Sequence, residues 1–164
     1  MKTKHPPAPS GHVVSLHLHP VEPGTPLPSV EAIELVAAKG IVNDTRYFDR
    51  LSRDTGKPTR RQVTLIEREQ IAAHAVALGL ESIPPGVVRS NIETSGINLI
   101  ALLGREIAIG KAVLRLYAPR DPCAKMDAIC QGLRARMMDQ RQGVLAEVVR
   151  SGKVHVGDRI RLSP

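Results

Sequence analysis

The chain has 164 residues, 42% of them hydrophobic, which suits one globular domain with a sizeable core. Only 2% of the residues are aromatic, which argues against the aromatic platforms on which single-stranded nucleic acid stacks. The formal net charge of +7 favours an anionic partner or a solvated basic surface. Because the arginines are dispersed rather than packed into one block, we expect a small anionic ligand and no specific nucleic-acid partner.

The composition also indicates the cellular compartment in which the protein is expected. No apolar stretch approaches the roughly 20 residues of a membrane-spanning helix, and the N-terminus lacks the apolar core of a signal peptide. Cys123 and Cys130 are separated by about 10 Å if both lie on one helix, which is beyond disulfide reach. We therefore expect free thiols, no membrane association and a cytoplasmic location.

The first predicted elements are a tail and a strand. Residues 1–11 combine lysine, proline and glycine and predict a disordered tail, which leaves residues 12–164 as the domain. Residues 12–19 alternate apolar and polar side chains and predict a strand. His17 and His19 share one face of that strand and could pair on a metal. No third ligand lies near them in the sequence, so we interpret both histidines as facing solvent.

Strands dominate most of the remaining chain. Residues 40–59, by contrast, are polar and turn-rich and predict a long loop beside the active site. Gly110-Lys111 and Gly157-Asp158 predict tight turns. Many short strands with two inserted helices indicate a mainly β fold with inserted helices, built as a partly closed β-barrel. The predicted strands cover residues 62–66, 87–93, 106–109, 112–117, 144–149 and 154–162.

Two segments have helical spacing. Residues 67–78 follow a capping box formed by Thr64 and Glu67 and end at Gly79. The second helix is predicted over residues 124–141. Its apolar stripe is interpreted as core rather than as a set of ligands, and consists of Met126, Ile129, Leu133 and Met137.

Cys123 stands at the start of this second predicted helix. Asp121 suits the N-cap and Pro122 the first helical position, which puts Cys123 in the first turn. Backbone N–H groups and the helix dipole stabilise a thiolate there, and Arg120 and Lys125 add positive potential. Such a thiolate could attack sulfur, accept a persulfide or bind a soft metal, whereas the alternative is a small buried hydrophobe. The other cysteine lacks this context, so we predict that Cys123 is the reactive thiol.

Short motifs follow one another in a characteristic order along nearly the whole chain. They are Gly40-Ile41-Val42-Asn43-Asp44-Thr45-Arg46-Tyr47, Arg61-Gln62-Val63-Thr64-Leu65-Ile66-Glu67, Arg89-Ser90-Asn91-Ile92, Pro122-Cys123, Gly143, and Gly152 through Gly157-Asp158. The ordered set resembles the MOSC domain, named for the C-terminal part of molybdenum cofactor sulfurases. The family usually has glycine where this chain has Asn43. If that position needs a positive φ, asparagine is the best substitute.

The resemblance implies a β-barrel that binds the pterin-based molybdenum cofactor (molybdopterin) or delivers sulfur. The family's cysteine corresponds to Cys123, which carries a persulfide in some members and ligates molybdenum in others. Similar small members reduce N-hydroxylated compounds, so we expect a molybdenum-dependent reductase of a small-molecule substrate. The alternative is a sulfur carrier with a persulfide on Cys123. We expect no fused pyridoxal-phosphate desulfurase or ferredoxin domain, so a flavin reductase or a cysteine desulfurase would act in trans.

The same resemblance assigns phosphate ligands. Arg46, Arg61 and Arg89 are the candidate clamps for the pterin phosphate, because guanidinium groups bind phosphate bidentately. For each of these arginines, solvation or an ordinary ion pair is an equal alternative. Arg120 and Lys125 complete the predicted cationic surroundings of the cofactor.

The remaining candidates are a thiol and two hydrogen-bonding side chains. Cys123 is the candidate catalytic residue and the candidate metal ligand. Asp44 and Asn91 are candidate hydrogen-bond partners of the cofactor, with an Asx turn and a strand-end cap as the respective alternatives. We expect Arg46, Arg61, Asn91 and Cys123 to converge on one cleft bordered by residues 40–59.

Overall fold

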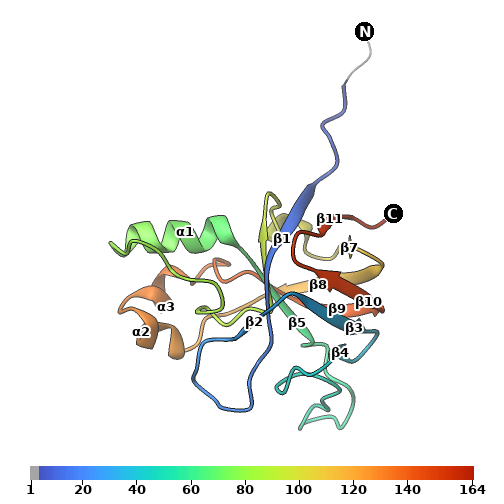
Figure 1. The fold of residues 1–164 in the computed structure, drawn as a ribbon, viewed down its shortest axis with the longest axis horizontal. Coiled ribbons are helices and arrows are strands. Elements are labelled where there is room, and N and C mark those ends of the chain that lie inside the picture. The colour runs from blue at the N-terminus through green and yellow to red at the C-terminus, as the bar shows by residue number, and fades with distance from the viewer. Residues whose placement is uncertain (1–3) are drawn as a thin grey trace.

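A closed barrel of seven strands forms the centre of the molecule in the computed structural model, which describes residues 4–164 (Figure 1). Neighbouring strands follow the order β11-β7-β8-β9-β5-β6-β1, and pairing of β11 with β1 closes the ring. The predicted mainly β class with inserted helices is confirmed, and the barrel closes completely. Its strands are β1 (Ser10–His17), β5 (Val63–Glu67), β6 (Ile92–Ser95), β7 (Glu106–Ile109), β8 (Ala112–Pro119), β9 (Val144–Arg150) and β11 (Arg159–Leu162).

Shorter strands extend this barrel. The two-residue β2 (Ser29–Val30) pairs with β1, and a separate sheet has the order β10-β3-β4. Within the barrel, β5 and β6 run parallel, with Leu65 opposite Ile92, so the segments that precede these two strands lie at the same edge. The separate sheet consists of β3 (Ala32–Val36), β4 (Gly40–Ile41) and β10 (Gly152–His155).

Two apolar clusters stabilise the fold. Aliphatic side chains fill the barrel, among them the fully buried Leu16, Leu65 and Leu116. The second cluster joins the barrel wall to three helices grouped on one side of the molecule (Figure 1). The predicted stripe from Met126 to Met137 packs here, so its interpretation as core is confirmed. The helices are α1 (Arg68–Ala77), α2 (Lys125–Ile129) and α3 (Leu133–Arg136), and a 3-10 turn η1 (Ile100–Leu102) precedes β7.

The long helix predicted over residues 124–141 is wrong, because the segment forms two short helices. Gly132 between them has φ 93°, a left-handed conformation that ends a helix. The Asp127 carboxylate accepts the Gly132 N–H at 3.2 Å and stabilises the break. Cys123 precedes the five-residue α2, whose N-cap is Ala124 without a side-chain cap. Asp121 therefore does not cap the helix, and Cys123 does not lie in a first helical turn.

Three smaller boundaries also differ from the prediction. Thr64 lies inside β5, and Glu67 is the N-cap of α1 without a side-chain cap hydrogen bond, so the capping box does not form. Residues 85–88 form turns, and β6 begins only at Ile92. Strand β1 begins at Ser10 rather than at residue 12. Of the predicted tail, residues 1–3 lie outside the described part of the chain, and residues 4–9 are exposed without regular secondary structure.

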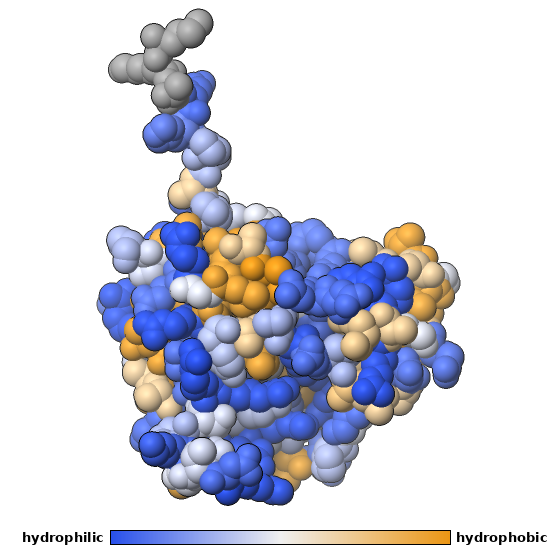
Figure 2. All heavy atoms as spheres, turned by 180° about the vertical axis from the view of Figure 1, so that it is seen from behind, coloured by the Kyte–Doolittle hydropathy of each residue, from blue (hydrophilic) through white to orange (hydrophobic). Residues whose placement is uncertain are grey.

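Most of the molecular surface seen from behind is hydrophilic, with apolar side chains gathered in limited patches (Figure 2). Within residues 4–164, none of the helices has both the length and the apolar character required to cross a bilayer.

Candidate functional site

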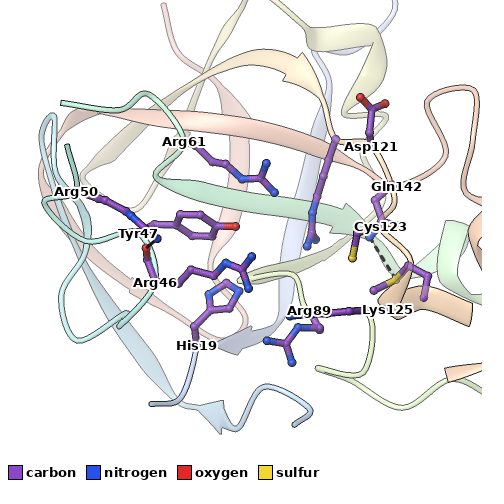
Figure 3. Close-up of a pocket in the computed structure, with 12 residues that line it drawn as sticks. His19, Arg46, Tyr47, Arg50, Arg61, Arg89, Asp121, Cys123, Lys125 and Gln142 are labelled. Carbon is purple, nitrogen blue, oxygen red and sulfur yellow. Dashed lines mark hydrogen bonds between the residues drawn. The ribbon is translucent and has the colours of Figure 1, made fainter. Parts of the chain in front are cut away.

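A cavity of about 340 Å³ lies beside β5 and gathers residues from many parts of the chain (Figure 3). Its volume falls in the usual range of small-ligand sites, roughly 300–1,000 Å³. Six of the eight predicted site residues line it, and they come from the loop after β4 and from the segments flanking β5, β6, β8 and α2. The lining residues are His19, Arg46, Tyr47, Arg50, Arg61, Arg89, Arg120, Asp121, Cys123, Lys125, Met126 and Gln142.

Positive charge dominates this lining. Five arginines and one lysine face a single lining carboxylate, that of Asp121. Among the described residues, none of these six side chains forms an ion pair with a carboxylate. Positive groups that converge in a concavity without counter-charges attract an anion. We call them the six cavity cations: Arg46, Arg50, Arg61, Arg89, Arg120 and Lys125.

Arg120 is one of the two buried arginines among these cations, with 8% of its surface exposed. Its Nη1 donates to Ser90 Oγ at 3.0 Å, a neutral acceptor. Burial, together with the neighbouring Arg61 and Arg46, lowers the pKa of Arg120 to about 10, although Tyr47 and Cys123 act in the opposite direction. A guanidinium that is buried against neutral partners is costly, so a bound anion would relieve that cost.

Arg89 is held in an unusual backbone conformation. Its φ is 65°, a left-handed value that non-glycine residues rarely adopt. The side chain is buried, and its Nη1 donates to the carbonyl of Thr25. Burial lowers the pKa of Arg89, and the nearby Arg46 lowers it further. Uncommon backbone conformations of this kind are concentrated at binding sites, where they aim a side chain.

Tyr47 organises the arginines of the loop. Its ring is 7% exposed, and the guanidinium carbons of Arg46 and Arg61 lie 5.6 Å and 5.3 Å from the ring centroid. Such cation–π contacts hold guanidinium groups without neutralising them. The Nε of Arg61 is buried and has no hydrogen-bond partner among the described residues, so one donor remains free for a ligand.

Asp44 and Asn91 act from behind the cavity wall rather than within the lining. Asp44 is 3% exposed, and its Oδ1 accepts the backbone N–H groups of Arg46 and Tyr47, each at 3.0 Å. Asn91 is fully buried, and its Nδ2 donates to Asp44 Oδ2 at 3.0 Å. Asn91 Oδ1 accepts from the Thr64 backbone and hydroxyl, both at 3.1 Å. The expected convergence of Asn91 on the cleft is therefore replaced by a positioning role, in which β5 and β6 anchor the loop.

The interpretation of the two histidines as facing solvent is wrong. His17 is fully buried and His19 is 4% exposed. The strand ends at His17, so the alternation that predicts an outward face does not extend to His19. His19 Nδ1 lies 2.8 Å from Asp44 Oδ2, and its ring packs edge-on against Tyr47 at 5.2 Å. His19 thus belongs to the cavity, which the sequence analysis did not anticipate.

Burial by itself would raise the pKa of Asp44. The hydrogen bond and positive potential of His19, with the backbone N–H groups of His19 and Tyr47, outweigh burial and lower the pKa of this carboxyl. Asp44 is therefore ionised at neutral pH and provides fixed negative charge behind the His19 ring.

The two cysteines differ in their surroundings. Cys123 is exposed, and its sulfur points into the cavity toward the arginines (Figure 3). Cys130 is half-buried outside the cavity, and its Sγ lies 3.7 Å from the carbonyl of the adjacent Gln131. Positive side chains rather than a helix terminus surround the Cys123 thiol, which corrects the predicted helix-dipole effect while keeping the predicted positive potential.

Gln142 is a further lining residue that no sequence motif indicated. It is 1% exposed, and its Oε1 has no partner among the described residues, while Nε2 lies 3.9 Å from Met126 Sδ (Figure 3). The adjacent Gly143 has φ 79°, and an added Cβ would lie 2.0 Å from the carbonyl oxygen of Leu65. Only glycine allows the chain to approach β5 so closely at this point.

Asn43 has φ 69°, so the position does require the left-handed conformation, and asparagine supplies it as predicted. Tyr47 and Arg50 follow Arg46 within the predicted loop, and their proximity to it is the signal that could have identified them. Gln142, which precedes Gly143 in an ordinary turn, offers no such signal.

Comparisons with known proteins were made for the sequence and for the fold. The family described as the MOSC domain matches residues 41–161. A sequence comparison with curated proteins finds no significant match. The YuaD protein (APC1665) from Bacillus subtilis superposes with a TM-score of 0.79 at 20% identity, covering 93% of this chain and 95% of that one. YiiM from Escherichia coli has a TM-score of 0.67 at 18% identity, with 94% and 70% covered. YiiM from Geobacillus stearothermophilus has a TM-score of 0.70 at 15% identity, with 94% and 75% covered.

Proposed function

This chain belongs to the MOSC domain family, and from that premise we propose that its cavity binds the molybdenum cofactor with Cys123 as the protein ligand of the metal. The observation that carries the proposal is the exposed thiol in the same cavity as the six cavity cations. The cofactor unites a phosphate with a soft metal, and the cavity unites guanidinium groups with a thiol. Each half of the ligand thus has chemically matched side chains.

The unpaired groups of the cavity fit the rest of such a ligand. Arg61 Nε is a buried donor without a partner, and Gln142 Oε1 is a buried acceptor without a partner. A pterin ring carries both acceptor and donor atoms and could satisfy both. Arg46, Arg89 and Arg120 would hold the phosphate, because their charges are not neutralised by neighbouring carboxylates.

The thiol would be the single protein donor to the metal. Within the described residues, no group of three or more histidine, cysteine or acidic side chains could hold a metal ion. A pterin dithiolene brings two sulfur donors of its own, so one thiolate suits such a metal without further protein ligands.

The reaction we propose is reduction of an N–O bond in an N-hydroxylated small molecule. When bound, the molybdenum cofactor supplies the redox metal for this chemistry, and a flavin reductase acting in trans supplies the electrons. The side chains of this chain would bind the cofactor, hold the thiolate among positive charges and present the substrate at an open cavity.

Metal and pterin analysis of the purified protein tests this proposal. The chain should be produced in a molybdenum-replete host, and molybdenum and pterin should be measured per chain for three proteins: wild type, Cys123→Ser and Cys130→Ser. We expect near-stoichiometric molybdenum in wild type and in Cys130→Ser, and loss of the metal in Cys123→Ser. Both substitutions should leave the fold intact, because Cys123 is exposed and Cys130 only half-buried.

Wild-type protein that lacks pterin after this expression would contradict the cofactor assignment. Equal molybdenum in wild type and in Cys123→Ser would contradict the role of the thiol. Addition of an N-hydroxylated substrate and a flavin reductase to the loaded protein then tests the reaction, and the absence of turnover would contradict the reductase assignment.

The exposure of Cys123 also supports a second function, that of a sulfur carrier. A thiol that accepts sulfur from another protein's persulfide must be reached from outside, and this thiol lies at an open cavity among cations. The Cys123 thiolate would attack the outer sulfur of a cysteine desulfurase persulfide, forming a new S–S bond while the desulfurase thiolate leaves. Incubation with a desulfurase and cysteine should then add the mass of one sulfur atom to wild type and to Cys130→Ser, but not to Cys123→Ser.

A further inference from the structure

We propose that His19, oriented by Asp44, binds oxyanions in the cavity as a proton-carrying ligand and donates that proton to the departing oxygen of the substrate. The catalytic half of this inference rests on the proposed N–O reduction, whereas the binding half depends only on the cavity. The comparisons assign no role to this histidine, which lies two residues beyond the end of β1 and which its sequence pattern predicted to face solvent.

The geometry of the pair resembles that of an oriented acid–base group. His19 Nδ1 and the His19 backbone N–H both meet Asp44 Oδ2, at 2.8 Å and 3.1 Å. The carboxylate accepts a hydrogen bond from Nδ1–H and so selects one tautomer, which leaves Nε2 as the atom that can gain or lose a proton. Nε2 has no hydrogen-bond partner among the described residues, and the ring lines the cavity.

The anchoring of this pair is unusually complete. Asp44 is held by Asn91 Nδ2 and by two backbone N–H groups of its own loop. Tyr47 packs edge-on against the imidazole, with the ring planes at 89°. The ring therefore cannot turn without breaking several contacts, so Nε2 keeps its orientation toward the cavity.

The charges around His19 couple its proton to the ligand. The six cavity cations oppose a further positive charge on the imidazole, whereas the Asp44 carboxylate favours it. An oxyanion bound among these cations adds negative charge and shifts the balance toward the imidazolium. By linkage, protonation must then strengthen anion binding by the same factor. The other titratable groups that line the cavity are Asp121, Tyr47 and Cys123.

The proposed reaction consumes such a proton. Reduction of R–NH–OH takes two electrons, here from a reduced flavoprotein, and two protons, and yields R–NH₂ and water. The N–O bond breaks, the oxygen leaves as water after protonation, and the nitrogen receives the second proton from solvent. His19 lines the same cavity as Cys123, so it is available to supply the first of these protons, and the Asp44 carboxylate stabilises the imidazolium before transfer.

Sulfate binding tests the first half without cofactor or activity, because sulfate does not titrate near neutral pH. Affinity should be measured at about pH 5.5 and at about pH 7.5, on either side of the ordinary histidine midpoint. All proteins should carry Cys123→Ser, so that the thiol does not titrate. We expect roughly tenfold tighter sulfate binding at the lower pH. This factor corresponds to one proton whose pKa rises by about one unit when sulfate binds.

The informative variant is His19→Asn, whose side-chain amide can keep the hydrogen bond to Asp44 but cannot carry the proton. Its sulfate affinity should change less than about twofold between the two pH values. A matched control is His155→Asn, since His155 forms an exposed pair with Asp158 at 3.7 Å, and it should keep the wild-type pH dependence. Equal pH dependence in His19→Asn and the parent protein, or none in the parent protein, would overturn the inference.

Turnover of the loaded protein tests the second half. With molybdenum and pterin contents equal to wild type, His19→Asn should lose about 10²–10⁴-fold in kcat, the usual contribution of a general acid. Its KM should change little at high pH. Wild-type kcat in a fully loaded His19→Asn protein would refute proton donation. A wild-type protein without turnover would refute only the proposed reaction, and the sulfate measurement would still decide the binding half.

Discussion

Arginine meets tyrosine in two regions of this molecule, and the regions differ in what balances the positive charge. In the cavity, the guanidinium groups of Arg46 and Arg61 flank Tyr47, and no carboxylate among the described residues pairs with them. Near the surface, Arg60 lies 4.3 Å from the Tyr117 ring and also binds Glu147 at 3.1 Å. The same residue types thus form a positive cluster without counter-charges in one region and a neutralised contact in the other.

This difference shows how a basic chain is to be interpreted. Arg115 pairs with Glu106 at 2.7 Å and with Glu147 at 3.5 Å, so it contributes little net field. Within residues 4–164, Arg120 has only the hydroxyl of Ser90 as a side-chain partner, although it is almost completely buried. The partner of an arginine, rather than the number of arginines, distinguishes a ligand-binding cation from a structural one.

The largest effect is expected at Arg120. The Arg120→Met variant should bind sulfate roughly 10–100-fold more weakly, which corresponds to the loss of a charged hydrogen bond worth about 1.5–3 kcal/mol. It should unfold at the same or a higher temperature, because it removes a desolvated charge without a counter-ion. Calorimetry and thermal denaturation measure the two effects, with Arg115→Met as the control. An Arg120→Met protein that is destabilised but keeps wild-type sulfate affinity would show that Arg120 is a structural arginine like those at the surface, and not a ligand-binding one.

A second effect is expected at Asp44, which holds the cavity loop. Asp44→Asn should lower the free energy of unfolding by about 1–3 kcal/mol at neutral pH, the cost of disrupting buried charged hydrogen bonds. Because the pKa of Asp44 is lowered by folding, its contribution is present above the unfolded value of about 3.9 and is lost as pH falls through the folded value. Urea denaturation at neutral pH and at about pH 3 measures the free energy of unfolding of both proteins. The difference between Asp44→Asn and wild type should be smaller at the acidic pH. A difference in unfolding free energy that does not depend on pH would contradict the stabilising role of the ionised Asp44 carboxylate.

The tyrosines themselves allow a direct comparison. Tyr47→Leu should weaken sulfate binding about two- to fivefold, since a cation–π contact is worth about 0.5–1 kcal/mol and its loss frees two arginines to move. Tyr117→Leu removes a ring of the same type, which lies beside Arg60, and should leave the sulfate affinity unchanged. Equal losses in the two variants would show that the rings act on general stability rather than on the ligand.

The smallest effect is expected at the paired surface arginines. Arg115→Ala should cost less than about 1 kcal/mol in unfolding free energy, as is usual for exposed ion pairs. Sulfate affinity should remain at the wild-type value, and the small stability difference should disappear at high salt. Chemical denaturation with and without added salt measures this stability difference. A large loss of unfolding free energy that persists at high salt would show that Arg115 contributes more to stability than an exposed ion pair does.

The course of the backbone was predictable where local chemistry decides it. Turns at Gly110 and Gly157 join strands as expected, and the left-handed conformation of Asn43 follows from the side chain that replaces glycine there. The helix over residues 124–141 was not predictable, because its apolar stripe does pack as core on both sides of the break at Gly132. Periodicity reports which side chains are buried, but not whether the backbone between them is continuous.

In the candidate site, too, some features were predictable from the sequence and others were decided only by the tertiary structure. The sequence by itself determined the family, since the order and type of its residues carry it, and it predicted Cys123 rather than Cys130 as the reactive thiol together with a set of cations. Only the tertiary structure decided that Asp44 and Asn91 support the wall, that His19 enters the cavity, and which arginines lack a carboxylate. Those properties depend on pairings between residues 25 to 47 positions apart along the chain, which only closure of the barrel brings into hydrogen-bond distance.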